Sequence, residues 1–136
     1  MNNRILLAAS SEEAFAIASI FPEQSELHIV DKLDIAQDSV LANEYRAIFI
    51  GLYFDGHCMF QLIKAIREKG PNKTVPIVCF RPFDSLFVRS LDSLVERAAR
   101  SFGAHEYWDL SLVVHSEFEA ERARAKIKQL MSSVAA

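Results

Sequence analysis

The most strand-like stretch of this chain is Ala47-Ile48-Phe49-Ile50, which lies within residues 46–52 and breaks at Gly51. A short, continuous apolar run of this kind is typical of a strand that is buried on both faces of a parallel sheet. A loop follows, and apolar residues then recur at helical spacing through residues 59–66 until a Lys-Gly-Pro sequence at residues 69–71. The stretch therefore predicts a buried strand, a loop and a crossover helix.

Similar strand–helix units extend outward in both directions. On the N-terminal side we predict a strand at residues 4–9, a helix that starts near Ser10 and ends at Pro22, a second strand at residues 27–30, and a short helix at residues 33–42 for which Asp34 is a candidate cap. On the C-terminal side we predict strands at residues 75–80 and 105–110 and a last helix over residues 116–131. Its apolar side is expected to consist of Phe118, Ala125, Ile127, Leu130 and Met131.

The segment between the last two strands predicts one long helix. Asp84 or Ser85 is a candidate cap, and Gly103 is a stop signal after Phe102. Because the apolar stripe is sustained, we expect a continuous helix from Ser85 to Phe102. The residues expected to be buried on one side of it are Phe87, Leu91, Leu94, Val95 and Ala98.

Alternation of strands and helices along the whole chain predicts a single α/β domain over residues 1–136. The expected architecture is a (βα)5 three-layer sandwich around a five-stranded parallel sheet with right-handed crossovers. A chain of 136 residues is long enough to bury a core of this kind. Sheets of this type bind or react at the carboxyl ends of their strands.

Composition excludes several classes of function. The net charge of −3 and the scattered basic residues argue against a nucleic-acid binder. The N-terminal apolar run is too short to span a membrane and no targeting segment is evident, so we expect a cytoplasmic protein.

Cys58 and Cys79 lack metal-ligand spacing and are expected to be free buried thiols. The sequence contains no glycine-rich phosphate loop and no nucleophile elbow, so we expect no cofactor, no metal and no enzymatic activity.

The order and spacing of the five units resemble the receiver (CheY-like) domain of two-component response regulators. The segments that carry the resemblance are residues 4–10, 47–51, 55–67, 75–80 and 102–108. The resemblance spans essentially the whole chain and depends on the order of these segments, because no single one is specific. It implies a flavodoxin-like fold and a role in signal transduction or phosphorelay through protein partners.

The resemblance also implies where phosphorylation chemistry would be located. Receivers use two acids after strand one to hold Mg²⁺, an aspartate after strand three to accept the phosphoryl group, a hydroxyl after strand four and a lysine after strand five. The corresponding positions here hold Ala9 and Ser10, Gly51, Arg81, and Leu110. All five depart from the pattern. The sequence therefore predicts a degenerate pseudo-receiver that acts by protein–protein interaction without aspartyl phosphorylation.

Some alternatives remain open at the level of sequence. Asp55 is either a displaced phospho-acceptor or part of a turn with Gly56, and a small flavodoxin-like enzyme is a third function class. Arg81 either fills the vacated pocket and pairs with Asp109 or Asp55, or points to solvent beside Pro82. The expected partner is a kinase, an output domain or a second copy of the chain, which includes a homodimer.

Tyr107 is the candidate partner-binding residue. The resemblance places it at the strand-five aromatic, whose packing changes in receivers when the hydroxyl after strand four moves toward phosphate. Without that hydroxyl nothing favours a second position of the ring, so we predict one dominant state and a constitutive surface with Tyr107 as a partly exposed anchor. The alternative is that Tyr107 packs against the fourth helix.

Overall fold

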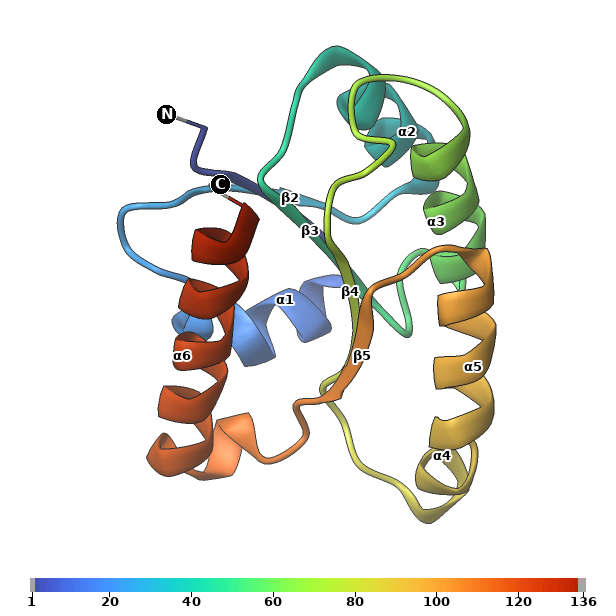
Figure 1. Cartoon of the computed structure of the whole chain (residues 1–136). Helices are drawn as coiled ribbons and strands as arrows, with labels where there is room; N and C mark the ends of the chain where they lie inside the picture. The colour runs from blue at the N-terminus through green and yellow to red at the C-terminus, as the bar shows by residue number, and fades with distance from the viewer. Residues whose placement is uncertain (1, 135–136) are drawn as a thin grey trace.

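A computed structural model describes residues 2–134 and shows a five-stranded, fully parallel sheet in the order β2-β1-β3-β4-β5 (Figure 1). The strands are β1 (Arg4–Ala8), β2 (Glu26–Val30), β3 (Ala47–Gly51), β4 (Ile77–Arg81) and β5 (Glu106–Asp109). Their limits agree with the sequence predictions to within about two residues. The predicted α/β fold class is confirmed.

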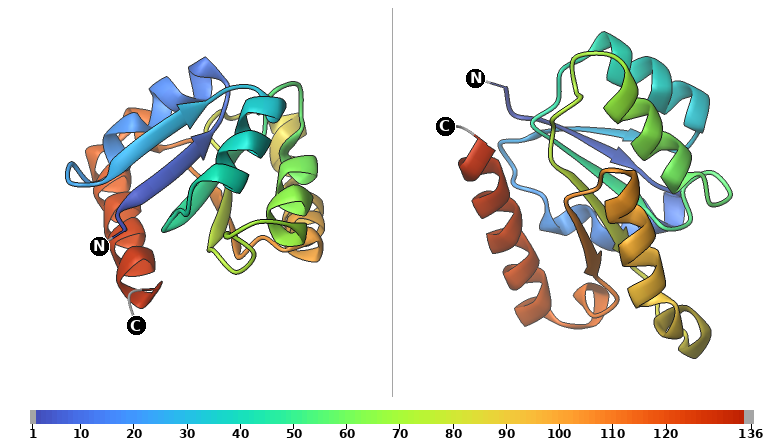
Figure 2. Two further views of the ribbon diagram at one scale, coloured as in Figure 1. Left: turned by 90° about the horizontal axis from the view of Figure 1, so that it is seen from above. Right: turned by 45° about the vertical axis from the view of Figure 1, so that its right-hand side comes forward.

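Helices cover both faces of the sheet, so the molecule has three layers (Figures 1 and 2). The helices are α1 (Ser11–Ile17), α2 (Leu33–Ala42), α3 (Met59–Glu68), α4 (Leu86–Ser90), α5 (Asp92–Phe102) and α6 (Glu117–Val134). Two short 3₁₀ helices, η1 (Ala18–Ile20) and η2 (Val113–His115), precede β2 and α6. Among the described helices, α1 and α6 pack on one face, and α2, α3 and α5 pack on the other.

Alternate residues of each central strand enter two separate hydrophobic clusters. In β1, Ile5 and Leu7 face α1 and α6, whereas Leu6 and Ala8 face α2 and α3, and all four are fully buried. Burial on both faces explains why the central strands read as continuous apolar runs rather than as alternating ones.

No helix within residues 2–134 is both long enough and apolar enough to cross a membrane.

The predicted long helix from Ser85 to Phe102 is wrong. The chain forms two helices that meet at Leu91, and no residue of α4 is buried. Phe87 is 74% exposed and Leu94 is 58% exposed, although both were predicted to be buried. The right-hand view of Figure 2 shows the reason, because α4 lies at the far end of α5, beyond the sheet on which its apolar residues could pack. Ser85 caps α4 by accepting a hydrogen bond from the Val88 N–H.

The predicted apolar side of the last helix is confirmed at Ile127, Leu130 and Met131 and is wrong at Phe118 and Ala125. Its buried residues are Ala120, Ala123 and Ile127, whereas Phe118 is 69% exposed and Ala125 is exposed. Small side chains at positions three and four residues apart let α6 approach the sheet closely, and Phe118 falls outside that stripe. The predicted contacts of Leu130 and Met131 with the core are confirmed.

The prediction that Asp34 caps α2 is wrong, in contrast to the confirmed cap at Ser85. Asp34 lies inside the first turn of α2, where its side chain accepts a hydrogen bond from the N–H of Ile35. The first N–H of α2, that of Leu33, instead donates to the Asp55 carboxylate at 2.8 Å. The cap therefore comes from a distant loop, which sequence spacing could not indicate.

Candidate functional site: the carboxyl end of the sheet

The five residues at the predicted pocket positions all lie at the carboxyl ends of neighbouring strands. Ala9 follows β1 and is buried, Ser10 caps α1, Gly51 ends β3, Arg81 ends β4, and Leu110 follows β5 and is buried. The Leu110 N–H donates to the Arg81 carbonyl at 2.9 Å, which extends the β4–β5 pairing to the end of the sheet. Of these five side chains only Ser10 and Arg81 are polar, and both form hydrogen bonds within the domain.

Glu13, in the first turn of α1, fills the centre of this region. Its side chain is fully buried and completes a capping box, in which the Ser10 N–H donates to Oε1 at 2.9 Å. The other carboxylate oxygen, Oε2, accepts a hydrogen bond from the N–H of Tyr53 in the loop after β3, also at 2.9 Å. A Cβ atom added to Gly51 would lie 2.4 Å from Oε1. The Glu13 carboxylate therefore occupies the space that any side chain at position 51 would enter.

Two features of the Glu13 environment shift the pKa of its carboxyl group in opposite directions. Burial raises the pKa of the carboxyl group, and the hydrogen bonds from Tyr53 and Ser10 partly offset this rise. The sequence analysis treated Glu13 only as part of a helix start and did not predict that its carboxylate lies beside Gly51 at the carboxyl end of the sheet. The available signal was the Ser-x-x-Glu capping box directly after strand one, combined with a glycine at the end of strand three.

Arg81 is the largest fully buried side chain among the described residues and forms the second feature of the site. Its Nε and Nη2 atoms donate to the two carboxylate oxygens of Asp92 at 3.0 and 2.9 Å. Nη2 also lies 2.9 Å from the Asp109 carboxylate, and Nη1 donates to the Phe83 carbonyl at 2.7 Å. The predicted pairing with Asp109 is confirmed, and the interpretation that Arg81 points to solvent is wrong.

The Arg81 cluster links β4, β5 and α5 into one hydrogen-bonded unit. The Tyr107 hydroxyl donates to Asp92 at 2.9 Å, and Asp109 accepts hydrogen bonds from the N–H and hydroxyl of Ser111. Burial alone would lower the pKa of Arg81, but the hydrogen bonds and charges of Asp92 and Asp109 raise it, so the guanidinium stays ionised. Within the described part of the chain, every buried side-chain nitrogen and oxygen has a hydrogen-bond partner.

Tyr107 is half-buried and packs against the hydrophobic cluster that contains α3 and α5. Burial and the hydrogen bond to Asp92 raise the pKa of its hydroxyl. The partly exposed ring agrees with the sequence prediction, and its hydroxyl contact with α5 agrees with the alternative interpretation. Its role in partner binding stays a prediction.

Asp55 lies in a turn with Gly56, and both residues have positive φ angles of 42° and 66°. Its carboxylate accepts the Leu33 N–H and lies 3.7 Å from the Lys32 ammonium group. The turn with Gly56 agrees with the turn interpretation, and the contacts with Lys32 and Leu33, which were not predicted, connect the loop after β3 to the start of α2. Its side chain is engaged away from Gly51 and the Arg81 cluster.

No group of three histidine, cysteine or acidic side chains within residues 2–134 is arranged to hold a metal ion. Cys58 and Cys79 are both free, with Cys58 half-buried and Cys79 buried. Burial raises the pKa of the Cys79 thiol to about 12, so this thiol is not a reactive thiolate at neutral pH. The predicted free thiols are confirmed, with Cys58 less buried than expected.

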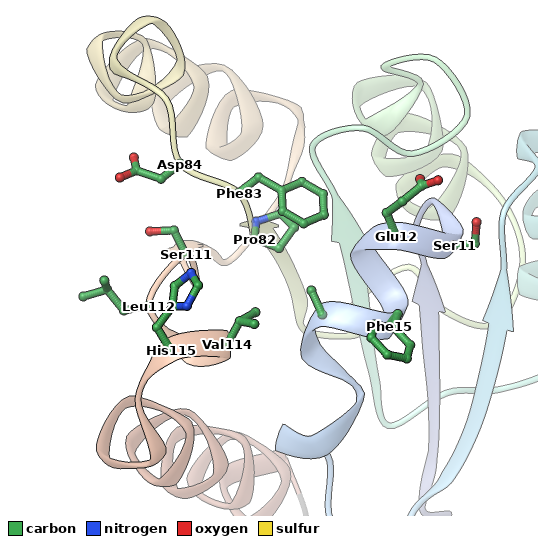
Figure 3. Close-up of a pocket in the computed structure, with 11 residues that line it drawn as sticks. Ser11, Glu12, Phe15, Pro82, Phe83, Asp84, Ser111, Leu112, Val114 and His115 are labelled. Carbon is green, nitrogen blue, oxygen red and sulfur yellow. The ribbon is translucent and has the colours of Figure 1, made fainter.

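An open apolar pocket adjoins the filled region. It has a volume of about 850 Å³ and lies between α1, the connection from β4 to α4, and the connection from β5 to α6 (Figure 3). Its apolar wall is formed by Phe15, Ala16, Pro82, Phe83, Leu112 and Val114. Phe15 is 90% exposed, so the structure leaves a large aromatic surface of the pocket in solvent.

Comparison with solved structures shows which fold this is. A response regulator from Hahella chejuensis superposes with a TM-score of 0.69 at 17% identity, over 98% of this chain and 95% of that one. A phosphorylated cyanobacterial phytochrome response regulator gives a TM-score of 0.74 at 12% identity, over 98% and 96%. The receiver domain of a sensor histidine kinase from Pseudomonas aeruginosa, with a magnesium ion in its active-site cleft, gives 0.66 at 14% identity over the whole of both chains. No protein-family model matches the sequence, and the search of curated proteins found no match. The chain therefore has the flavodoxin-like fold of response-regulator receivers.

Proposed function

We propose that this chain is a single receiver-like signalling domain of a two-component-type system that works by protein–protein contact and is not phosphorylated on aspartate. The observation that carries the proposal is the position of Glu13. Its carboxylate lies where a side chain at position 51 would project, and position 51 is a glycine. An acceptor is therefore missing, and the space for one is occupied by an internal hydrogen-bonded carboxylate.

The Arg81 cluster supports a domain with one dominant state. A receiver switches because a phosphoryl group interacts differently with two arrangements of its pocket, and without such a difference a ligand cannot shift the equilibrium. Here a buried guanidinium, contributed by the chain itself, pairs with both Asp92 of α5 and Asp109 of β5. The Tyr107 hydroxyl donates a hydrogen bond to the same Asp92 carboxylate, which favours a single position of the ring.

Two alternatives make different predictions. If Asp55 were a displaced phospho-acceptor, its carboxylate would have to leave the α2 N-terminus that it caps. A flavodoxin-like enzyme should carry a flavin or nucleotide after purification, which absorbance and mass spectrometry of the purified protein would reveal. We therefore propose a non-enzymatic domain that is cytoplasmic, with a kinase, an output domain or a second copy as its partner.

The direct test is phosphorylation by a small phosphodonor. Incubation with acetyl phosphate and Mg²⁺ should leave the intact mass unchanged. A known receiver incubated in parallel provides the positive control, and Asp55→Ala provides the matched variant. A stable gain of one phosphate that Asp55→Ala abolishes would support the displaced acceptor and contradict the proposal.

The proposed role of Tyr107 needs a separate test. If its ring anchors a partner, Tyr107→Ala should weaken partner binding by about 1–3 kcal/mol while circular dichroism shows an intact fold. Unchanged binding by the folded variant would show that Tyr107 serves only the internal contact with Asp92. Affinity that responds to phosphodonors would contradict a constitutive surface.

A further inference from the structure

Helix α4 carries two exposed apolar side chains, Leu86 and Phe87, which we call the knob. No other segment of the described part of the chain packs over them. Leu86 is 84% exposed and Phe87 is 74% exposed, and they are adjacent in a five-residue helix that buries none of its residues. Two large neighbouring apolar side chains at the tip of a projecting helix form a contiguous exposed patch. Such patches mark interaction sites.

The pocket beside Phe15 is the complementary feature. Its wall is apolar, its volume of about 850 Å³ exceeds that of two large side chains, and Phe15 and Phe83 present aromatic surface to it (Figure 3). Both features leave apolar surface in water, at about 25 cal/mol for each Å² exposed. A knob that fills the pocket would remove both exposed surfaces at once.

Charges beside the two features also match. Glu12 lines the pocket and has no ion-pair partner within residues 2–134. Arg89 projects from α4, is exposed, and makes a long contact of 3.6 Å with Asp84 as its ion pair. An α4 helix seated in the pocket therefore brings an arginine to an unpaired glutamate.

We propose that the chain forms a twofold dimer in which each copy inserts Leu86 and Phe87 into the other copy's pocket. The knob and the pocket lie next to each other, because the pocket wall includes Phe83 and Asp84 and α4 begins at Leu86. A twofold axis beside this segment uses the same surface of both copies, so the exchange is reciprocal and closes at two subunits. The Arg81 cluster fixes the base of α4 from both ends through Phe83 and Asp92.

This inference shares one premise with the proposed function, namely that the domain binds a protein partner. Here that partner is a second copy of the chain. Phosphodonor labelling and self-association are independent measurements. A labelled protein would contradict the proposed function and leave the dimer standing, whereas an unlabelled monomer would do the reverse.

Sedimentation of the full chain over a concentration series tests the dimer. Wild type should show a monomer–dimer equilibrium. Phe87→Glu in the knob and Phe15→Glu in the pocket should each weaken association by about tenfold or more. Both side chains are exposed in the monomer, so the variants should fold. The matched control is Ile35→Glu on α2, which also replaces a half-exposed apolar residue but should leave association unchanged.

Charge exchange tests the register of the dimer. Glu12→Arg and Arg89→Glu should each weaken association, because each places like charges together at two symmetry-related contacts. An equimolar mixture of the two variants should associate like wild type, since each contact again joins opposite charges. The double variant should also recover.

Three results would overturn the proposal. The first is a wild-type chain that stays monomeric up to about 1 mM, because that limit corresponds to a binding free energy weaker than about −4 kcal/mol. The second is a dimer that is unaffected by both Phe15→Glu and Phe87→Glu, which would place the interface elsewhere. The third is assembly beyond two subunits, which would exclude reciprocal exchange.

Discussion

The filled carboxyl end of the sheet and the apolar face beside it differ in which side chains they bury. In the first region the charged residues Glu13 and Arg81 are buried and fully hydrogen-bonded. In the second region, Phe15, Leu86 and Phe87 are left in solvent. A buried ionisable side chain is tolerated when it is hydrogen-bonded or paired with an opposite charge, and an exposed apolar patch marks an interaction site. Under the proposed function, the carboxyl end of the sheet serves as internal structure, and the exposed apolar surface beside it is the proposed binding site.

The largest expected effect comes from opening the Arg81 cluster. Arg81→Met keeps the length of the side chain but removes the guanidinium that pairs with Asp92 and Asp109. Removing one partner of a buried ion pair should lower the free energy of unfolding by about 3 kcal/mol. Urea denaturation measures this loss. The matched control is Arg97→Met on α5, where the arginine is exposed and a change of about 0.5 kcal/mol or less is expected. Equal losses of unfolding free energy in Arg81→Met and Arg97→Met would show that the buried ion pairs of Arg81 do not stabilise the fold.

The second effect tests whether Glu13 and position 51 share one space. Gly51→Ala should destabilise the protein by about 1–2 kcal/mol, because the added Cβ overlaps the Glu13 carboxylate. Glu13→Ala should cost about 2 kcal/mol through the loss of the capping box and the Tyr53 contact. The double variant should cost clearly less than the sum, because the overlap disappears with the carboxylate. Additive costs in this double-mutant cycle would mean that the two residues do not compete.

A smaller effect separates the hydroxyl of Tyr107 from its ring. Tyr107→Phe removes the hydrogen bond to Asp92 and should lower the free energy of unfolding by about 1 kcal/mol. Because the ring remains, partner binding should be unchanged, in contrast to the expected result for Tyr107→Ala. Denaturant titration and binding measured on the same protein preparation make the comparison. Loss of partner binding in Tyr107→Phe would show that the binding surface depends on the hydrogen bond between Tyr107 and Asp92.

Sequence patterns were sufficient for the central part of the fold because burial on both faces leaves a strong local signal. The apolar runs predicted β1 and β3, and the Ser10 cap predicted the start of α1. The pattern failed for α4 because an apolar stripe at helical spacing does not reveal whether a packing surface lies beneath it. Leu86 and Phe87 continue the stripe of α5 in sequence, but both are exposed, and the short helix α4 that carries them extends beyond the sheet.

The candidate site was partly predictable for a related reason. The sequence placed Gly51 and Leu110 at the ends of strands three and five, and the structure confirms these positions. It did not indicate which side chains fill the region between the strand ends, because these come from other elements. Glu13 reaches the pocket from α1, and Asp92 reaches Arg81 from α5, eleven residues along the chain. Pairing of this kind depends on the three-dimensional fold and has no fixed sequence spacing.

The smallest expected effect is the acid dependence contributed by Asp109. Burial alone would raise the pKa of this carboxyl group, but hydrogen bonds from Ser111 and the charge of Arg81 outweigh it and lower the pKa below its usual value. A pKa that is lower in the folded state gives stability that is present above the unfolded-state pKa of about 4 and is lost as the pH falls through the folded-state value. Asp109 is half-exposed, so solvent screening limits its contribution to at most about 1 kcal/mol. Asp109→Asn should therefore lower the free energy of unfolding near pH 6 and have progressively less effect below about pH 4, as measured by urea denaturation at each pH. A cost that is the same at both pH values would show that the ion pair between Asp109 and Arg81 does not stabilise the protein through its charge.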